Sequence, residues 1–155
     1  MAMTKRETAE RYFLEGYNCA QAVVLTFADE LNIDRDTLLK ISSSFGGGFG
    51  RLREICGAVS GMGIVAGALK GCDFSEAGQD AKSKHYALIQ QLAGAFREIN
   101  GSIVCRELLG AKIAATNPQP DSRTPEYYKS RPCAKLVGDA AEIAEKYLTE
   151  QRDCE

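Results

Sequence analysis

Six cysteines are the residues of this sequence with the clearest chemical potential. They are widely spaced, and no two of them form a C-x-x-C pair. The local sequence therefore contains neither a zinc ribbon nor a thioredoxin-type motif. Any site shared by several cysteines must be assembled by the fold. The six are Cys19, Cys56, Cys72, Cys105, Cys133 and Cys154.

Helix-start signals accompany most of these cysteines. Asn18 and Ser102 are expected N-caps, and Pro132 suits the first position of a helix. These signals place three cysteines in first turns and a fourth within about one turn of a helix start, given a boundary error of roughly 2 to 4 residues. In chain order the four are Cys19, Cys56, Cys105 and Cys133.

A helix start influences the chemistry of a thiol. Its unpaired N–H groups and the positive end of the helix dipole favour a thiolate over a thiol. Arg53, Arg106 and Arg131 lie close in sequence to these cysteines and are expected to act in the same direction. A thiolate attacks disulfides and binds metals, so the pattern predicts one of these two uses. Inert packing as a small hydrophobe is the alternative, and it is the favoured interpretation for Cys72 and Cys154.

The stretch 45–71 is unusually rich in glycine and contains Cys56. A glycine loop at residues 46–50 precedes an apolar run that we expect to be a buried helix. Within this run, glycines recur every four residues, so they form small-residue strips against which other helices can pack closely. We expect the loop glycines to let distant helix starts approach Cys56. The loop lacks the G-x-G-x-x-G and GK[ST] spacings of phosphate-binding loops, so we assign it no phosphate role.

Helical periodicity extends over most of the chain, and no stretch alternates with the two-residue period of a strand. The predicted fold is all-α: a single-domain bundle of about six to seven helices around the glycine-rich central helix, spanning residues 1–155. Residues 1–3 are interpreted as a tag remnant or frayed end, and residues 150–155 as a frayed tail. The expected helices cover about 4–16, 18–31, 34–44, 55–71, 75–99, 102–110 and 132–148, with a long connection over 111–131 that includes one helical turn at 126–129.

Charge and hydrophobicity along the chain argue against several classes of protein. The formal charge is −2, and no basic run is interleaved with aromatic residues, so we expect no nucleic-acid partner. The charged N-terminus differs from a signal peptide, which predicts a reducing cytoplasm. The longest apolar run, 55–69, is shorter than the roughly 20 residues that span a bilayer, so the protein is not expected to cross a membrane. His85, the one histidine, lies on an apolar stripe and is interpreted as a core or edge residue.

Several short motifs in the sequence resemble those of one known family. They are GYNCAQAV at 16–23, FGGG at 45–48, CGAVSG at 56–61, CRELLG at 105–110 and, finally, Cys133. Together they resemble the C_GCAxxG_C_C family of putative redox-active proteins, and the resemblance covers nearly the whole chain. It implies a small all-helical protein, a redox role that rests on shared cysteines, and an association with transporters. By position, the family's cysteines are Cys19, Cys56, Cys105 and Cys133.

Three hypotheses follow. The first is a thiol–disulfide oxidoreductase in which these four cysteines form disulfides reversibly, with no cofactor and with a redox partner protein or small thiol. Cys56 is then the expected attacking thiol, and Cys105 or Cys133 resolves. The second is a module that binds zinc or an iron–sulfur cluster through the same four cysteines. The third is a helical interaction protein with structural cysteines. A homo-oligomer is compatible with all three.

Overall fold

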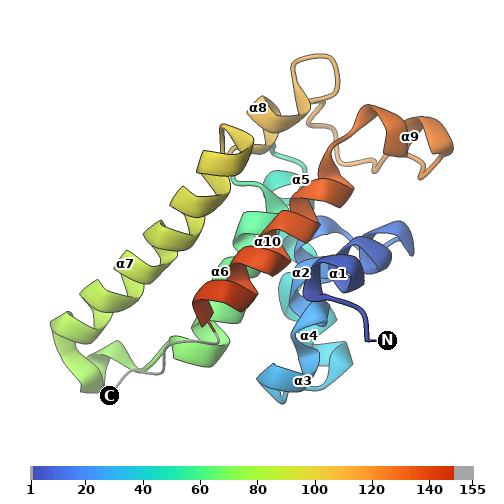
Figure 1. The fold of residues 1–155 in the computed structure, drawn as a ribbon. Coiled ribbons are helices and arrows are strands. Elements are labelled where there is room, and N and C mark those ends of the chain that lie inside the picture. The colour runs from blue at the N-terminus through green and yellow to red at the C-terminus, as the bar shows by residue number, and fades with distance from the viewer. Residues whose placement is uncertain (1, 149–155) are drawn as a thin grey trace.

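The computed structural model describes residues 2–148, and over this range the protein is an all-α bundle (Figure 1). The described residues contain no strand, only an isolated antiparallel bridge between Ile55 and Val104. The predicted all-α fold is therefore confirmed. The elements are α1 (Lys5–Leu14), α2 (Cys19–Thr26), α3 (Ala28–Leu31), α4 (Arg35–Ser42), the 3₁₀ turn η1 (Ser43–Phe45), α5 (Gly46–Phe49), α6 (Gly57–Lys70), α7 (Phe74–Asn100), α8 (Cys105–Leu109), α9 (Pro125–Ser130) and α10 (Cys133–Leu148).

The core lies among α1, α2, α6 and α10, which pack against one another. Valine and alanine dominate the contact faces, so the helices can approach closely. Burying such side chains contributes about 25 cal/mol for each Å² of apolar surface removed from water. Fully buried examples from three of these helices are Val23, Val65 and Val137.

Local capping explains where the first helices begin. Thr4 and Glu7 form the predicted capping box of α1, and Asn18 forms a second box with Gln21 at the start of α2. Each box satisfies N–H groups that the first turn leaves unpaired. The helix α4 is capped by Asp34, whose side chain accepts from the backbone N–H of Thr37. The expected helix over 18–31 is wrong in one detail, because it is divided at Phe27 into α2 and α3.

The glycine segment is more compact than the open loop that the sequence predicts. Residues Gly46–Phe49 form the short helical turn α5, although Gly47 and Gly48 within it adopt left-handed backbone angles. Their φ values of 65° and 72° are readily available only to glycine. The turn reverses the chain directly before the segment that carries Cys56.

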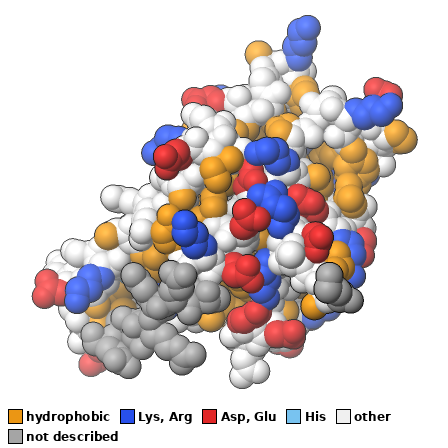
Figure 2. All heavy atoms as spheres, viewed as in Figure 1, with side chains coloured by type: hydrophobic (Ala, Val, Ile, Leu, Met, Phe, Trp, Pro, Cys, Tyr) orange, Lys and Arg blue, Asp and Glu red, His pale blue; other side chains and the backbone are white. Residues whose placement is uncertain are grey.

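The long helix α7 runs alongside α6 and α10 and projects beyond them (Figure 1). Gly78, with a φ of 86°, interrupts its first turns. Where α1 meets α10, acidic and basic side chains gather on the surface (Figure 2), and Arg6 there forms ion pairs with Asp139 and Glu142. Among the described helices, none has the combination of length and apolarity needed for a bilayer span.

Candidate functional site

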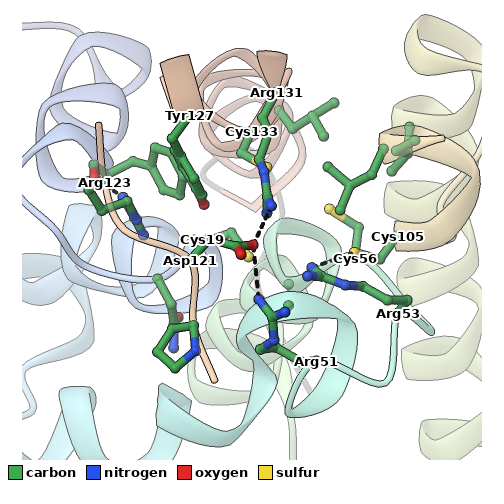
Figure 3. Close-up of a pocket in the computed structure, with 18 residues that line it drawn as sticks. Cys19, Arg51, Arg53, Cys56, Cys105, Asp121, Arg123, Tyr127, Arg131 and Cys133 are labelled. Atoms are coloured by element: carbon green, nitrogen blue, oxygen red, sulfur yellow. Dashed lines mark hydrogen bonds and ion pairs between the residues drawn. The ribbon is translucent and has the colours of Figure 1, made fainter. Parts of the chain in front are cut away.

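The four cysteines singled out by the sequence line a single pocket (Figure 3). Each comes from a different helix start: Cys19, Cys105 and Cys133 are first residues of α2, α8 and α10, and Cys56 is the N-cap of α6. The predicted placement of the four cysteines at helix starts is thus confirmed, although the N-cap of α8 is Val104 and not the expected Ser102. All four are thiols, and the pocket encloses about 120 Å³. The fold brings together residues more than a hundred positions apart in sequence.

The isolated bridge places Cys56 beside Cys105. The Cys56 N–H donates to the carbonyl of Ile103 at 2.8 Å, and the Cys105 N–H donates to that of Glu54 at 2.6 Å. Because side chains alternate across paired extended segments, and Ile55 faces Val104, Cys56 and Cys105 share the opposite face. This pairing aims both thiols into the pocket.

Two glycines make room for the other helix starts. A Cβ atom on Gly57 would collide with the Cys19 sulfur and lie 2.8 Å from the Phe45 carbonyl oxygen. A Cβ atom on Gly48 would lie 2.6 Å from the Cβ of Cys105. The prediction that glycines allow the cysteines to crowd together is therefore confirmed at these two positions.

Burial opposes thiolate formation in the pocket. Burial removes these side chains from solvent. It raises the pKa of Cys133 to about 12 and the pKa of Cys56 well above its ordinary value. The pKa of Cys105 is also raised by burial, although the nearby Arg53 guanidinium limits the rise. The sequence argument for resting thiolates is wrong for these three residues, because it counted helix ends and arginines but not burial, which disfavours the charged form.

Among the four pocket cysteines, Cys19 is the one whose charge acts on all the others. A negative charge on Cys19 raises the pKa of each of the other three thiols. Its side chain is half-buried, whereas Cys56 is only 5% exposed. Cys56, the expected attacking thiol, is therefore the less accessible of the two, and the guanidinium of Arg53 contacts Cys105, with Nη1 3.8 Å from the sulfur.

Charged side chains line the pocket together with apolar ones such as Phe13 and Leu136 (Figure 3). Arg131 lines the pocket as its position beside Cys133 suggested, whereas Arg106 points outward and pairs with Glu54. The other charged lining residues were not identified from the sequence. They are Arg51, Asp121 and Arg123.

The connection 111–131 supplies several of these unpredicted residues. Asp121 bridges Arg51 and Arg131, and Arg123 donates hydrogen bonds to the carbonyls of Phe13 and Tyr17. The predicted helical turn within this connection is confirmed as α9. Its length was the available signal, because long connections without secondary structure are commonly functional.

The remaining candidate residues lie away from the pocket or outside the described range. Cys72 follows α6 and does not line the pocket, and Cys154 lies outside residues 2–148. His85 is half-buried on α7, with its ring 5.9 Å from that of Phe74. Within the described residues, no three cysteine, histidine or carboxylate side chains form a group that could hold a metal ion. Ligation by all four cysteines would therefore require their side chains to move.

Comparison with known proteins agrees with this arrangement. Residues 17–147 match the family described as putative redox-active protein (C_GCAxxG_C_C). The chain belongs to this family. No curated protein and no solved structure matches it. The family match begins two residues before Cys19 and extends past Cys133, so all four cysteines of the C_GCAxxG_C_C pattern fall within it.

Proposed function

We propose that this C_GCAxxG_C_C protein carries out reversible thiol–disulfide exchange with a disulfide substrate. The observation that carries the proposal is the convergence of four thiols from four helix starts on one pocket. Cysteines that serve only as packing residues have no need to share a cavity lined by arginines. A disulfide between two of these cysteines requires their Cα atoms to lie roughly 4.4 to 6.8 Å apart.

Cys19 is our choice for the attacking thiol. It is half-buried, and it interacts electrostatically with each of the other three. After losing its proton to solvent, the Cys19 sulfur attacks one sulfur of the substrate and releases the other as a thiolate, which takes up a proton. Cys56, beside Gly57 and hence near the Cys19 sulfur, then loses its proton and attacks that sulfur. The bond between Cys19 and the substrate breaks, and the second substrate half leaves as a thiolate, which takes up a proton.

Protons and electrons balance over these two exchange steps. The protein gains one disulfide and loses two thiol protons and two electrons, while the substrate disulfide becomes two thiols. A second thiol or dithiol, from a partner protein or a small molecule, reverses the reaction. A reducing compartment such as the cytoplasm keeps the four pocket cysteines as thiols. In a transporter-associated setting, the substrate disulfide would belong to the transporter or its cargo.

Single serine substitutions test the proposal. The reduced protein is mixed with a neutral disulfide, bis(2-hydroxyethyl) disulfide, and the released thiol is measured with time. We expect Cys19→Ser to abolish release, and Cys56→Ser to stop the reaction at a mixed disulfide on Cys19 detectable by mass spectrometry. Cys72→Ser is the control for thiol release outside the pocket, because Cys72 is disulfide-bonded and does not line the pocket. Thiol release that persists unchanged in Cys19→Ser would contradict the assignment.

Metal analysis separates this proposal from the metal-binding alternative. Protein purified without oxygen is assayed for zinc, iron and acid-labile sulfide. Exchange chemistry predicts a protein that reacts with disulfides without stoichiometric metal. Stoichiometric zinc or iron that is lost in each of the four pocket serine variants would instead favour ligation.

A further inference from the structure

The ionised side chains that line the cysteine pocket carry more positive than negative charge. Arginine contributes four of them and aspartate one: Arg51, Arg53, Arg123 and Arg131 against Asp121. Figure 3 shows the guanidinium groups of Arg51, Arg53 and Arg131 directed toward the space beside the cysteines. A cavity with this charge in low-dielectric surroundings attracts anions.

Three of the arginines already have protein partners. Arg51 and Arg131 share the Asp121 carboxylate. Arg123 donates to two backbone carbonyls, and its guanidinium carbon lies 4.2 Å from the centre of the Phe13 ring. These contacts hold the three arginines in position around the pocket.

Arg53 differs from the other three. Its Nε donates to the carbonyl of Ala115 at 3.0 Å, and Nη1 lies 3.8 Å from the Cys105 sulfur. Nη2 is buried and has no hydrogen-bond partner within residues 2–148. The residue is only 3% exposed, and no carboxylate in the described residues forms an ion pair with it. A guanidinium group remains protonated in proteins, so its charge cannot be relieved by deprotonation.

Cys105 does not supply the missing negative charge. Burial raises the pKa of its thiol, so it remains neutral near pH 7. A buried charge without a counterion is costly, and an unmade hydrogen bond adds to that cost. An anion entering the pocket would neutralise the charge of Arg53 and accept the hydrogen bond from Nη2.

We propose that the cysteine pocket binds a small oxygen anion, held by Nη2 of Arg53 beside the Cys105 thiol. Its chemistry is that of a carboxylate on a small disulfide or of an inorganic oxyanion. Binding of the anion does not require redox chemistry, whereas its role as part of the substrate rests on the proposed function.

Calorimetry of the reduced protein with sulfate tests the site directly. The titration is made at low ionic strength with dithiothreitol as an uncharged reductant. We expect one saturable site, and a loss of at least about tenfold in affinity for Arg53→Gln, as for a charge-assisted hydrogen bond. Arg106→Gln is the matched control, because Arg106 is exposed and outside the pocket. Absence of saturable binding, or equal affinity in Arg53→Gln, would overturn the proposal.

Asp121→Asn keeps the test decisive if Arg53→Gln fails to fold. Asp121 is half exposed, so its replacement leaves the buried core intact. Removing the one carboxylate of the pocket wall should tighten sulfate binding by about threefold or more. An affinity that stays unchanged or falls in this variant would contradict an electrostatic anion site.

A pair of disulfides identifies the source of the anion. Dithiodipropionate carries carboxylates, whereas bis(2-hydroxyethyl) disulfide is neutral. If the anion belongs to the substrate, dithiodipropionate displaces sulfate, and Arg53→Gln raises its KM about tenfold without changing the KM of the neutral disulfide. Sulfate binding that dithiodipropionate does not displace supports an inorganic oxyanion. If sulfate binds but neither disulfide is reduced, the anion site stands and the proposed function fails.

Discussion

The glycines of the stretch 45–71 fall into two groups with opposite surroundings. At Gly48 and Gly57, an added Cβ atom would collide with the segments that carry Cys105 and Cys19. At Gly63 and Gly67, farther along α6, an added Cβ atom would meet nothing within 4 Å. The first pair is required by the assembly of the pocket, whereas the second pair is not required by any contact within the described residues.

The expectation of close packing along both strips is therefore only half right. Gly61 continues the crowded side, because its Cβ atom would lie 2.9 Å from the Cβ of Val23 on α2. At Gly63 and Gly67, by contrast, no part of the chain that the structure describes lies within 4 Å of an added Cβ atom. Substitutions on the two sides should thus have opposite effects on stability.

The largest effect is expected for Gly48→Ala. The residue has a φ of 72°, and its Cβ atom would lie 2.8 Å from the Arg53 Cα as well as close to Cys105. Backbone strain and overpacking together should lower the free energy of unfolding by about 3 kcal/mol or more, measured by urea denaturation. Gly50→Ala is the control, since its φ is 59° but its nearest neighbour is 3.9 Å away. Equal losses in both variants would mean that contact with Cys105 does not matter.

Gly57→Ala should have the next largest effect, a loss of about 2 kcal/mol with displacement of the Cys19 sulfur. Alkylation of Cys19 is expected to change in rate while the other pocket thiols keep theirs. In a double-mutant cycle with Cys19→Ala, removal of the sulfur should reduce the cost of Gly57→Ala. Strictly additive losses would show that the two residues do not touch.

The buried thiols of the pocket should also make the free energy of unfolding depend on pH. Below about pH 9, Cys133 is protonated whether the chain is folded or not. Between that value and its folded pKa of about 12, the unfolded chain loses the proton first, so the free energy of unfolding falls as pH rises. The contribution is about 1.4 kcal/mol per pH unit. Cys133→Ser should show a correspondingly shallower slope in urea denaturation between pH 9 and 11, and an unchanged slope would contradict it.

The smallest effect, and the one of opposite sign, is expected for Gly63→Ala and Gly67→Ala. Both positions are inside α6, where alanine is favoured over glycine by about 0.5 to 1 kcal/mol. Urea denaturation should show each variant to be more stable than the parent by roughly this amount. Destabilisation by either alanine would show that this strip is covered in solution.

The sequence predicted what local chemistry determines. Caps such as Asn18 and the periodicity of the apolar residues located the helix starts, and these placed the four cysteines correctly. Tertiary contacts determined the rest: the Arg53 guanidinium contacts Cys105, which is distant in sequence, and Asp121 and Arg123 enter the pocket from a connection without periodic pattern. The raised pKa values arise from burial, which no short stretch of sequence reveals.

Disulfide trapping in the pocket tests the central claim most directly. The reduced protein is treated with bis(2-hydroxyethyl) disulfide, its remaining thiols are alkylated, and its peptides are mapped by mass spectrometry. The proposed function predicts a disulfide between Cys19 and another pocket cysteine, with release of the reduced form of the reagent. Four pocket thiols that stay unreactive in the folded protein, and are alkylated only in denaturant, would contradict it.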